Sequence, residues 1–211
     1  MAQMSMNKAI HGAFRRDLAR FLDAFDRFSD GDTRRAADLG RAWQNFDTEL
    51  DHHHHGEHEI AWPALRAVGV SDELITQLDG EHEAMVTALE KARGAVKTFA
   101  VSATKGDADV AREAVASLQA VMETHMTHEE AEIEPVFLAN EGSEPLKEMG
   151  RKFGRERSPM AAGRFFAWVS DGASPEETAA IKEQVPGPVL LLIGGLFGRG
   201  YRREVAPVWR A

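Results

Sequence analysis

Apolar residues recur at steps of three and four along four long stretches of the chain. This spacing places them on one face of an α-helix, because a helix completes a turn about every 3.6 residues. The four stripes cover residues 10–28, 39–60, 74–99 and 114–140. Glycines interrupt the pattern between them, at Gly31, Gly69 and Gly106. Alternating β-branched runs are missing, so we predict an all-α fold, an up-down-up-down four-helix bundle with short connections.

The last third of the chain has a different pattern. A capping-box sequence begins at Ser174 and predicts a helix start there. Pro186, Pro188 and the glycines that follow predict short, kinked helices. We therefore expect residues 1–142 to form the bundle, and residues 143–211 to form a C-terminal helical extension packed on it.

Composition and charge narrow the classes of partner. With 211 residues, 43% of them apolar, the chain is long enough for one domain with an appendage and a substantial core. The 28% of charged residues suits a folded surface rather than a disordered chain. A net charge of −9 argues against binding to a phosphate backbone, which requires a basic face. We expect no nucleic-acid partner.

No segment resembles a targeting or membrane-spanning sequence. The first residues lack the long apolar run of a signal peptide. The longest apolar stretch, residues 185–197, contains two prolines and three glycines and is shorter than the roughly 20 residues of a membrane span. We therefore expect no membrane partner and a cytoplasmic location.

Cysteine is absent from the chain. Disulfides, thiolate nucleophiles, iron–sulfur clusters and thiolate zinc sites are thereby excluded. Any metal must be held by nitrogen and oxygen ligands.

Histidines and glutamates occupy positions on the apolar stripes where core residues belong. These residues are His11, His53, Glu57, His82, His125 and Glu129. A buried carboxylate without a partner costs several kcal/mol and would normally take up a proton. A metal is the simplest source of the counter-charge that these stripes require.

The same residues lie at matching depths in the predicted bundle. Counted from the turns near residues 31, 69–70 and 105–106, their offsets on neighbouring helices differ by only a few residues. At roughly 1.5 Å per residue the differences are a few ångströms, so the side chains can converge at one level.

An internal repeat supports this convergence. In two segments a Glu follows a His by four residues and a Pro follows it by ten, starting at His53 and at His125. A spacing of four places His and Glu on one helix face, one turn apart. Two such pairs, with lone histidines from the other two helices, match the di-metal sites of helix bundles.

The number of donors indicates which metal is bound. Four imidazoles, two bridging carboxylates and a bridging oxo or hydroxo group fill about ten of the twelve positions of two octahedra. One or two positions then stay open for a small oxidant. Mixed imidazole and carboxylate ligation favours two iron ions, with manganese or zinc fitting less well.

At these positions the sequence resembles the hemerythrin-like (HHE cation-binding) family. The resemblance covers about residues 7–140 and depends on His11, His53-x3-Glu57, His82 and His125-x3-Glu129, together with the two prolines. It implies a non-heme di-iron centre that meets dioxygen, hydrogen peroxide or nitric oxide.

The chain departs from the oxygen-carrying hemerythrins in two places. They have a His-x3-His pair on the third helix, whereas Val86 stands four residues after His82, and they use an aspartate where this chain has Glu129. A fifth imidazole must come from elsewhere or be missing, and His54 and His128 are the possible additional metal ligands. The other histidines of the run, His52 and His55, and also His58, are expected at the surface. Tyr201, the only tyrosine, is expected to serve in packing.

These features predict a di-iron protein that binds and reduces or disproportionates a small oxidant: hydrogen peroxide, nitric oxide with peroxide, or dioxygen. No catalytic residue separate from the metal ligands is expected. The alternatives are a reversible dioxygen carrier or sensor, and an iron-binding protein without turnover. The sequence leaves open whether the protein is a monomer or a small homo-oligomer.

Overall fold

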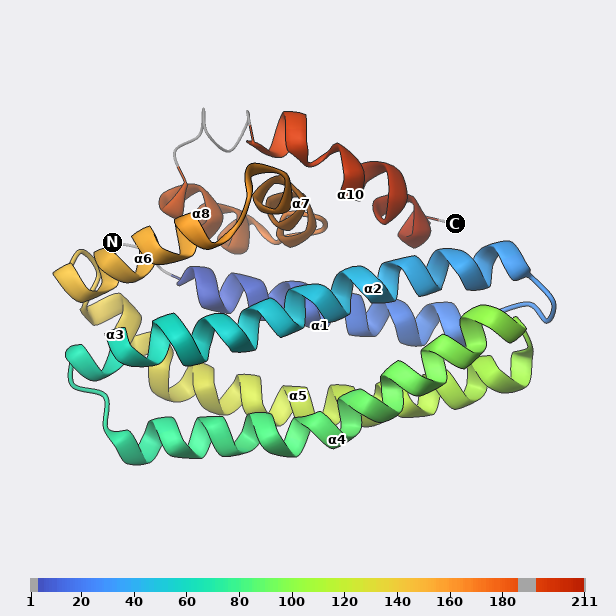
Figure 1. Cartoon of the computed structure of the whole chain (residues 1–211), viewed down its shortest axis with the longest axis horizontal. Helices are drawn as coiled ribbons and strands as arrows, with labels where there is room; N and C mark the ends of the chain where they lie inside the picture. The colour runs from blue at the N-terminus through green and yellow to red at the C-terminus, as the bar shows by residue number, and fades with distance from the viewer. Residues whose placement is uncertain (1–3, 186–192, 211) are drawn as a thin grey trace.

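The computed structural model describes residues 4–185 and 193–210, and within them every regular element is a helix. Four long helices run antiparallel to their neighbours in the chain and form a bundle (Figure 1). They are α1 (Met6–Asp26), α2 (Thr33–Gly56), α4 (Asp72–Ser102) and α5 (Lys105–Ala139). The predicted all-α bundle is confirmed. None of the described helices is both long enough and apolar enough to cross a bilayer.

Local signals explain where the long helices begin and end. Each starts after a residue whose side chain accepts a hydrogen bond from a backbone N–H of the first turn, the usual stabilisation of a helix start. These N-caps are Ser5, Asp32, Ser71 and Thr104. The α1–α2 connection turns at Gly31, whose φ of 81° would strain a residue with a side chain. These features keep the loops short and hold the four helices in register.

The bundle core is rich in aromatic rings. Phe14, Phe21 and Phe46 are fully buried and pack edge to face in a continuous group.

The apolar stripes predict which face of each helix is buried, but not every buried position. On α5, Val115 and Met122 are buried, whereas Ala114 and Val121 are only partly covered. Leu118, His125 and Glu129 are also buried, so the buried face is shifted by one residue from the predicted stripe only at these two positions.

A π-helical turn interrupts the second long segment. It is η1 (Glu57–Ala61), and α3 (Trp62–Ala67) continues from it without a loop. A π turn holds one residue more than an α turn, and such turns are frequent at functional sites. Here the turn begins at Glu57 and lets both Ile60 and Trp62 reach the interior.

The remaining described residues form shorter helices on the side of the bundle away from α4 and α5 (Figure 1). Most of them lie against α1 or α2, whereas the first packs on α3 and η1. They are α6 (Glu144–Glu156), α7 (Pro159–Val169), α8 (Pro175–Gln184), η2 (Ile193–Phe197), α10 (Arg199–Glu204) and η3 (Ala206–Arg210). The expected capping box at Ser174 is present. Pro186 and Pro188 lie outside the described residues. The boundary at residue 142 stays a prediction.

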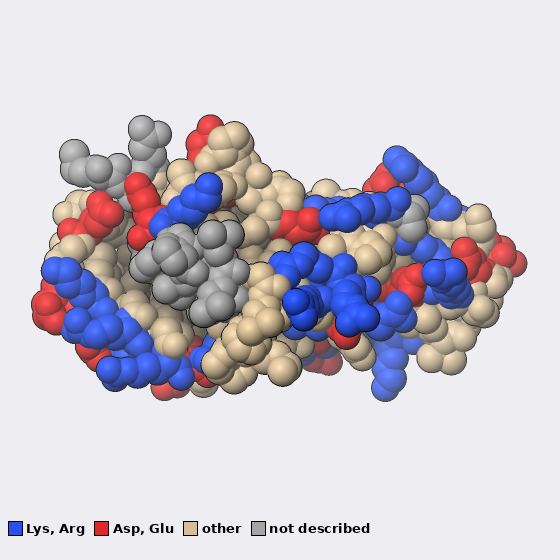
Figure 2. Space-filling model, turned by 90° about the horizontal axis from the view of Figure 1, so that it is seen from above, with Lys and Arg blue, Asp and Glu red and all other residues tan. Residues whose placement is uncertain are grey.

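Opposite charges help to hold these helices on the bundle. Residues 143–211 contain eleven Lys and Arg against eight Asp and Glu, whereas residues 1–142 contain fourteen against twenty-six. Figure 2 shows Lys and Arg gathered in patches on the face that carries the shorter helices. One of these cations reaches inward, where Arg157 Nη1 lies 2.7 Å from the buried Glu49 Oε2.

Asp17 on α1 is the centre of a second inward contact. Its carboxylate is 1% exposed, accepts the indole N–H of Trp168 at 2.8 Å and pairs with Arg20 at 3.1 Å. Burial outweighs these hydrogen bonds and the charge of Arg20, and raises the pKa of Asp17 to about 6.

The raised pKa of Asp17 predicts a pH dependence of stability. The folded state takes up this proton more readily than the unfolded chain, so its contribution to stability falls as the pH rises through about 4 to 6. For metal-free protein, the unfolding free energy of the wild type minus that of Asp17→Asn should therefore decrease by roughly 1 kcal/mol between pH 5 and 7. Urea denaturation at the two pH values measures it, and parallel behaviour of the two proteins would contradict the assignment.

Candidate metal centre

The six residues singled out by the sequence come together inside the bundle. His11 lies on α1, His82 on α4, and the two His–Glu pairs on α2–η1 and on α5. Four of the six are almost fully buried, His11 at 0%, Glu129 at 1%, His125 at 2% and Glu57 at 3% exposure. Such burial of charged side chains requires partners inside the protein.

A first group contains His11, His53, Glu57 and Glu129, with one donor atom of each within 4.8 Å of the others. The Nε2 atoms of His11 and His53 lie 3.2 Å apart. His53 Nε2 is 3.1 Å from Glu57 Oε1, and His11 Nε2 is 3.1 Å from Glu129 Oε2.

A second group contains His54, Glu57 and His82. His125 adjoins it, with its Nε2 only 2.9 Å from His82 Nε2. Glu57 belongs to both groups through different atoms, because its Oε2 is 3.3 Å from His82 Nε2 while its Oε1 faces His53. Glu129 also lies between them, with Oε2 3.8 Å from His125 Nε2.

These N···N and N···O distances are those expected between ligand atoms bound to one metal ion. Donor atoms bound at about 2.1 Å and at right angles lie about 3 Å apart. Two imidazole nitrogens facing each other at such distances would otherwise set lone pair against lone pair or share one proton. A carboxylate that offers one oxygen to each of two groups has the arrangement of a bridging ligand.

The buried carboxylate oxygens provide an independent test of the fit. Glu57 Oε1 and Oε2 are buried and have no hydrogen-bond donor. Burial and the nearby charges of Glu129 and Asp79 raise the pKa of Glu57 well above its usual value. The protein alone thus leaves Glu57 short of positive charge, which a cation between the two groups would supply.

The imidazoles are held in the form that binds metal. Burial and the neighbouring imidazoles lower the pKa values of His53 and His54 well below 6.5, and burial with His125 lowers that of His82 to about 4. These rings are neutral and keep a lone pair, as ligation requires. His11 differs, because burial is outweighed by the Glu129 and Glu130 carboxylates, which raise its pKa to about 9. Its proton supplies part of the positive charge that these carboxylates require.

Carboxylates outside the cluster orient the ligand rings. Glu130 Oε1 lies 3.0 Å from His11 Nδ1, and Glu81 Oε2 lies 2.9 Å from His125 Nδ1. Each contact places the N–H of the ring on Nδ1 and directs Nε2 to the centre, the arrangement common at metal sites.

Replacing Glu81 with alanine should weaken metal binding by roughly 10- to 100-fold, because His125 loses the partner that fixes its ring. Competition with a chelator measures the affinity. Glu83→Ala is the matched control, since Glu83 is an exposed glutamate two residues away on the same helix. Equal losses in the two variants would contradict an orienting role.

The two possible additional ligands are placed differently. His54 lies inside the second group, and its ring stacks on that of His82 with centroids 4.2 Å apart. His128 faces away from the cluster, is one-third exposed, and contacts Glu81 Oε1 at 2.6 Å through Nδ1. The histidines expected at the surface, His52, His55 and His58, are exposed.

Other nearby polar groups were not anticipated from the sequence. Asn7 Nδ2 donates to Glu129 Oε1 at 2.9 Å, and Asp79 Oδ1 accepts the indole N–H of Trp62 at 2.7 Å. Position alone is a weak signal for both, because each is a polar residue on a helix with many. Tyr201 is fully buried among the shorter helices, where its hydroxyl donates to Asp171 at 3.0 Å, consistent with a packing role.

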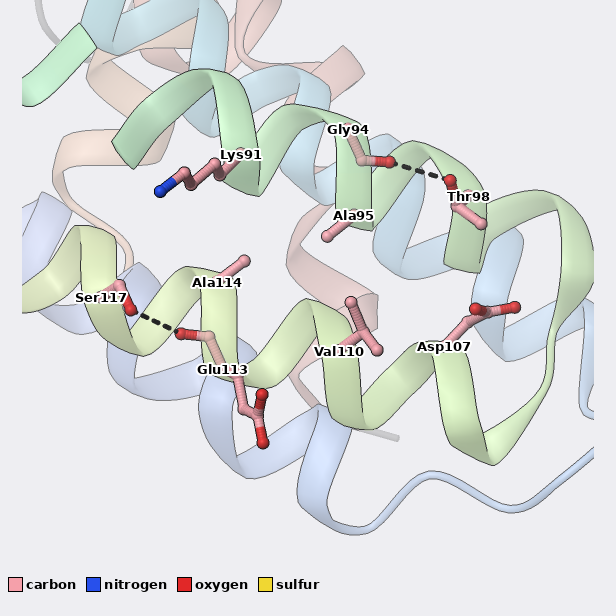
Figure 3. A pocket seen from close by; sticks show the side chains of 9 residues that line it. All are labelled: Lys91, Gly94, Ala95, Thr98, Asp107, Val110, Glu113, Ala114 and Ser117. Atoms are coloured by element: carbon pink, nitrogen blue, oxygen red, sulfur yellow. Dashed lines mark hydrogen bonds between the residues drawn. The ribbon is translucent and has the colours of Figure 1, made fainter. Parts of the chain in front are cut away.

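A surface groove of about 470 Å³ between α4 and α5 lies apart from these residues (Figure 3). None of its lining residues is a histidine. Thr98 and Ser117 there donate to backbone carbonyls of their own helices, so their hydroxyl protons are already engaged. The groove offers no competing metal site.

Comparison with known proteins agrees with the helical fold. A family model described as the hemerythrin HHE cation binding domain matches residues 5–137, which include the four long helices up to near the end of α5 and all six clustered residues. No curated protein and no solved structure matches the chain. The match covers more than half of the sequence, and the chain belongs to the hemerythrin HHE cation-binding domain family.

Proposed function

We propose that the cluster holds two iron ions and that the protein reduces or disproportionates hydrogen peroxide. The observation that carries this proposal is the position of Glu57, whose two oxygens face two separate groups of imidazoles at 3.1 and 3.3 Å. His11, His53 and Glu129 would hold one ion, and His54, His82 and His125 the other, with Glu57 and Glu129 between them.

The donor set supports a site with room for a small ligand. Five imidazoles, two bridging carboxylates and an oxo or hydroxo bridge would fill about eleven of twelve octahedral positions. An ion held by His11 and His53 would have two imidazole ligands, against three for an ion held by His54, His82 and His125, and would be the one with room for a small ligand. Phe14 packs on the His53 ring at 5.3 Å and keeps bulk water from that side.

Iron is proposed over zinc because the reaction needs electrons. An iron pair can give two electrons to peroxide and take them back, whereas zinc has no redox chemistry. The residues of the chain would supply the rest: they would hold the ions at a fixed separation, Glu130 and Glu81 would keep the protons of His11 and His125 on Nδ1, and Phe14 would keep bulk water from the His53 side.

The test is to load metal-free protein with ferrous iron under anaerobic conditions, add hydrogen peroxide and record oxygen release. Turnover well above that of the same concentration of free iron is expected, together with about two irons per chain and the absorption of an oxo bridge. The zinc-loaded protein is the control, because it keeps the ligands and lacks the redox couple. Turnover no greater than that of free iron would refute the proposal.

Reversible binding of dioxygen is a second candidate, favoured by the fifth imidazole that His54 supplies. Against it, the second group lies near the surface, with 12% of the His82 side chain and 30% of Glu81 exposed. Water access promotes oxidation of the ions rather than reversible release of oxygen. A charge-transfer band that appears with oxygen and disappears under vacuum would favour the carrier, whereas rapid irreversible oxidation would favour turnover.

A further inference from the structure

One tryptophan directly contacts a residue of the His and Glu cluster. The Trp62 ring lies nearly parallel to the His82 ring, with an interplanar angle of 19° and centroids 6.2 Å apart. Trp62 is 1% exposed, in a small apolar group with Leu65, Ile75 and Leu78. An indole is the most easily oxidised of these side chains, and its position gives electrons a short path to His82.

Asp79 joins the indole to the cluster. Its Oδ1 accepts the Trp62 N–H at 2.7 Å and lies 3.9 Å from His82 Nδ1, while its Oδ2 lies 3.5 Å from His58 Nδ1. Within the described part of the chain, the ion-pair partners of Asp79 are these two imidazoles, with no Lys or Arg among them. Its negative charge is therefore not neutralised by a fixed cation.

Trp168 provides the comparison within the same molecule. It is also 1% exposed and also donates its indole N–H to an aspartate, Asp17, at 2.8 Å. That carboxylate already pairs with Arg20 at 3.1 Å. The Trp168 ring is separated from His53 by Phe14, with centroid distances of 5.0 and 5.3 Å. Both differences make Trp168 the poorer electron donor to the cluster.

We propose that Trp62 is an electron donor to the metal centre and that Asp79 stabilises its oxidised form; this rests on the proposed reaction with peroxide. Reduction of hydrogen peroxide to two molecules of water consumes two electrons and two protons. One electron comes from the indole π system of Trp62 and passes to the peroxide-oxidised centre. The indole keeps its Nε1 proton and becomes a radical cation.

The Asp79 charge offsets the cost of forming a cation in a buried, apolar position. An external one-electron donor then returns Trp62 to its neutral state, a second such cycle supplies the second electron, and the two protons come from solvent. The protein thereby gains a peroxidase activity towards small reductants, in addition to disproportionation.

The experiment uses iron-loaded wild-type protein carrying ring-deuterated tryptophan. Peroxide is added, samples are frozen within milliseconds, and electron paramagnetic resonance is recorded. A radical whose signal narrows on deuteration is expected. Mass spectrometry after repeated peroxide additions without reductant should find oxidised Trp62 at least about tenfold above oxidised Trp168. A radical unaffected by deuteration, or oxidation mainly at Trp168, would overturn the assignment.

Variants distinguish the role of Trp62 as electron donor from the roles of the residues around it. Trp62→Phe should lose the radical and most of the peroxide-dependent oxidation of ascorbate, whereas Trp168→Phe should keep both, and metal analysis verifies equal loading. Asp79→Asn retains an acceptor for the indole N–H but removes the charge, and should lower the radical yield severalfold. A wild type that consumes peroxide without forming any radical overturns the role of Trp62 alone. A wild type that consumes no peroxide overturns the proposed function itself.

Discussion

Replacing Glu57 with alanine should abolish the binding of a metal pair. Each of its two oxygens faces a different group of imidazoles, so the change would remove one ligand from each ion. The loss of affinity should exceed the roughly 10- to 100-fold cost of removing an outer hydrogen-bond partner. Metal analysis after dialysis should fall from about two ions per chain to one or none.

The same variant should lose more stability relative to the wild type with metal than without it. Ligands that bind only the folded state stabilise it by about 2.7 kcal/mol at a hundred times their dissociation constant. Wild-type protein should therefore melt at a higher temperature with metal, and Glu57→Ala should lose most of that increase. Without metal the variant is relieved of a buried carboxylate that lacks a partner, so its loss of packing is partly offset.

Glu59→Ala is the matched control for Glu57→Ala. Glu59 lies in the same π turn, and its side chain is 57% exposed. It should bind metal as the wild type does. A Glu57→Ala protein that still binds two ions with wild-type affinity would show that the carboxylate does not bridge them.

The second large effect on metal affinity is expected at His54 and not at His128. The sequence alone could not tell which of the two is a ligand. His54→Ala should weaken metal binding by more than 100-fold, because it removes an imidazole from the second group. His128→Ala should change it by no more than about tenfold, since His128 acts through Glu81, which keeps its contact with His125. Isothermal titration of both variants with the same metal gives the comparison, and the reverse order would place the fifth imidazole at His128.

Much of the fold could be predicted because apolar residues recur along the chain with the period of an α-helix. Four stripes at helical spacing and the glycine breaks specify antiparallel helices, and the depth of each His or Glu follows from its distance to a turn. The same reasoning explains why the six clustered residues could be selected from sequence alone. Their separation of about 3 Å could not be predicted, because it depends on side-chain conformations across four helices.

The residues whose roles the sequence could not predict lie mainly around the cluster. His54 and His128 are equivalent on a helical wheel, and only the packing of α2 against α4 places one ring on His82 and leaves the other outside. Glu81 was not singled out because an acid beside His82 on an acidic helix is unremarkable by pattern. The role of Asp79 depends on the position of Trp62, which follows an irregular turn that a regular periodicity cannot reveal.

The extra residue in the π turn η1 separates the side-chain directions of α2 from those of α3. Residues before Glu57 and residues after Ala61 follow helices of different phase, so the directions of His53 and of Trp62 are set separately. If the same residues continued as a regular α-helix, Trp62 would lie about 100° further around the helix axis, away from His82. The π turn therefore decides whether an oxidisable ring lies beside the cluster.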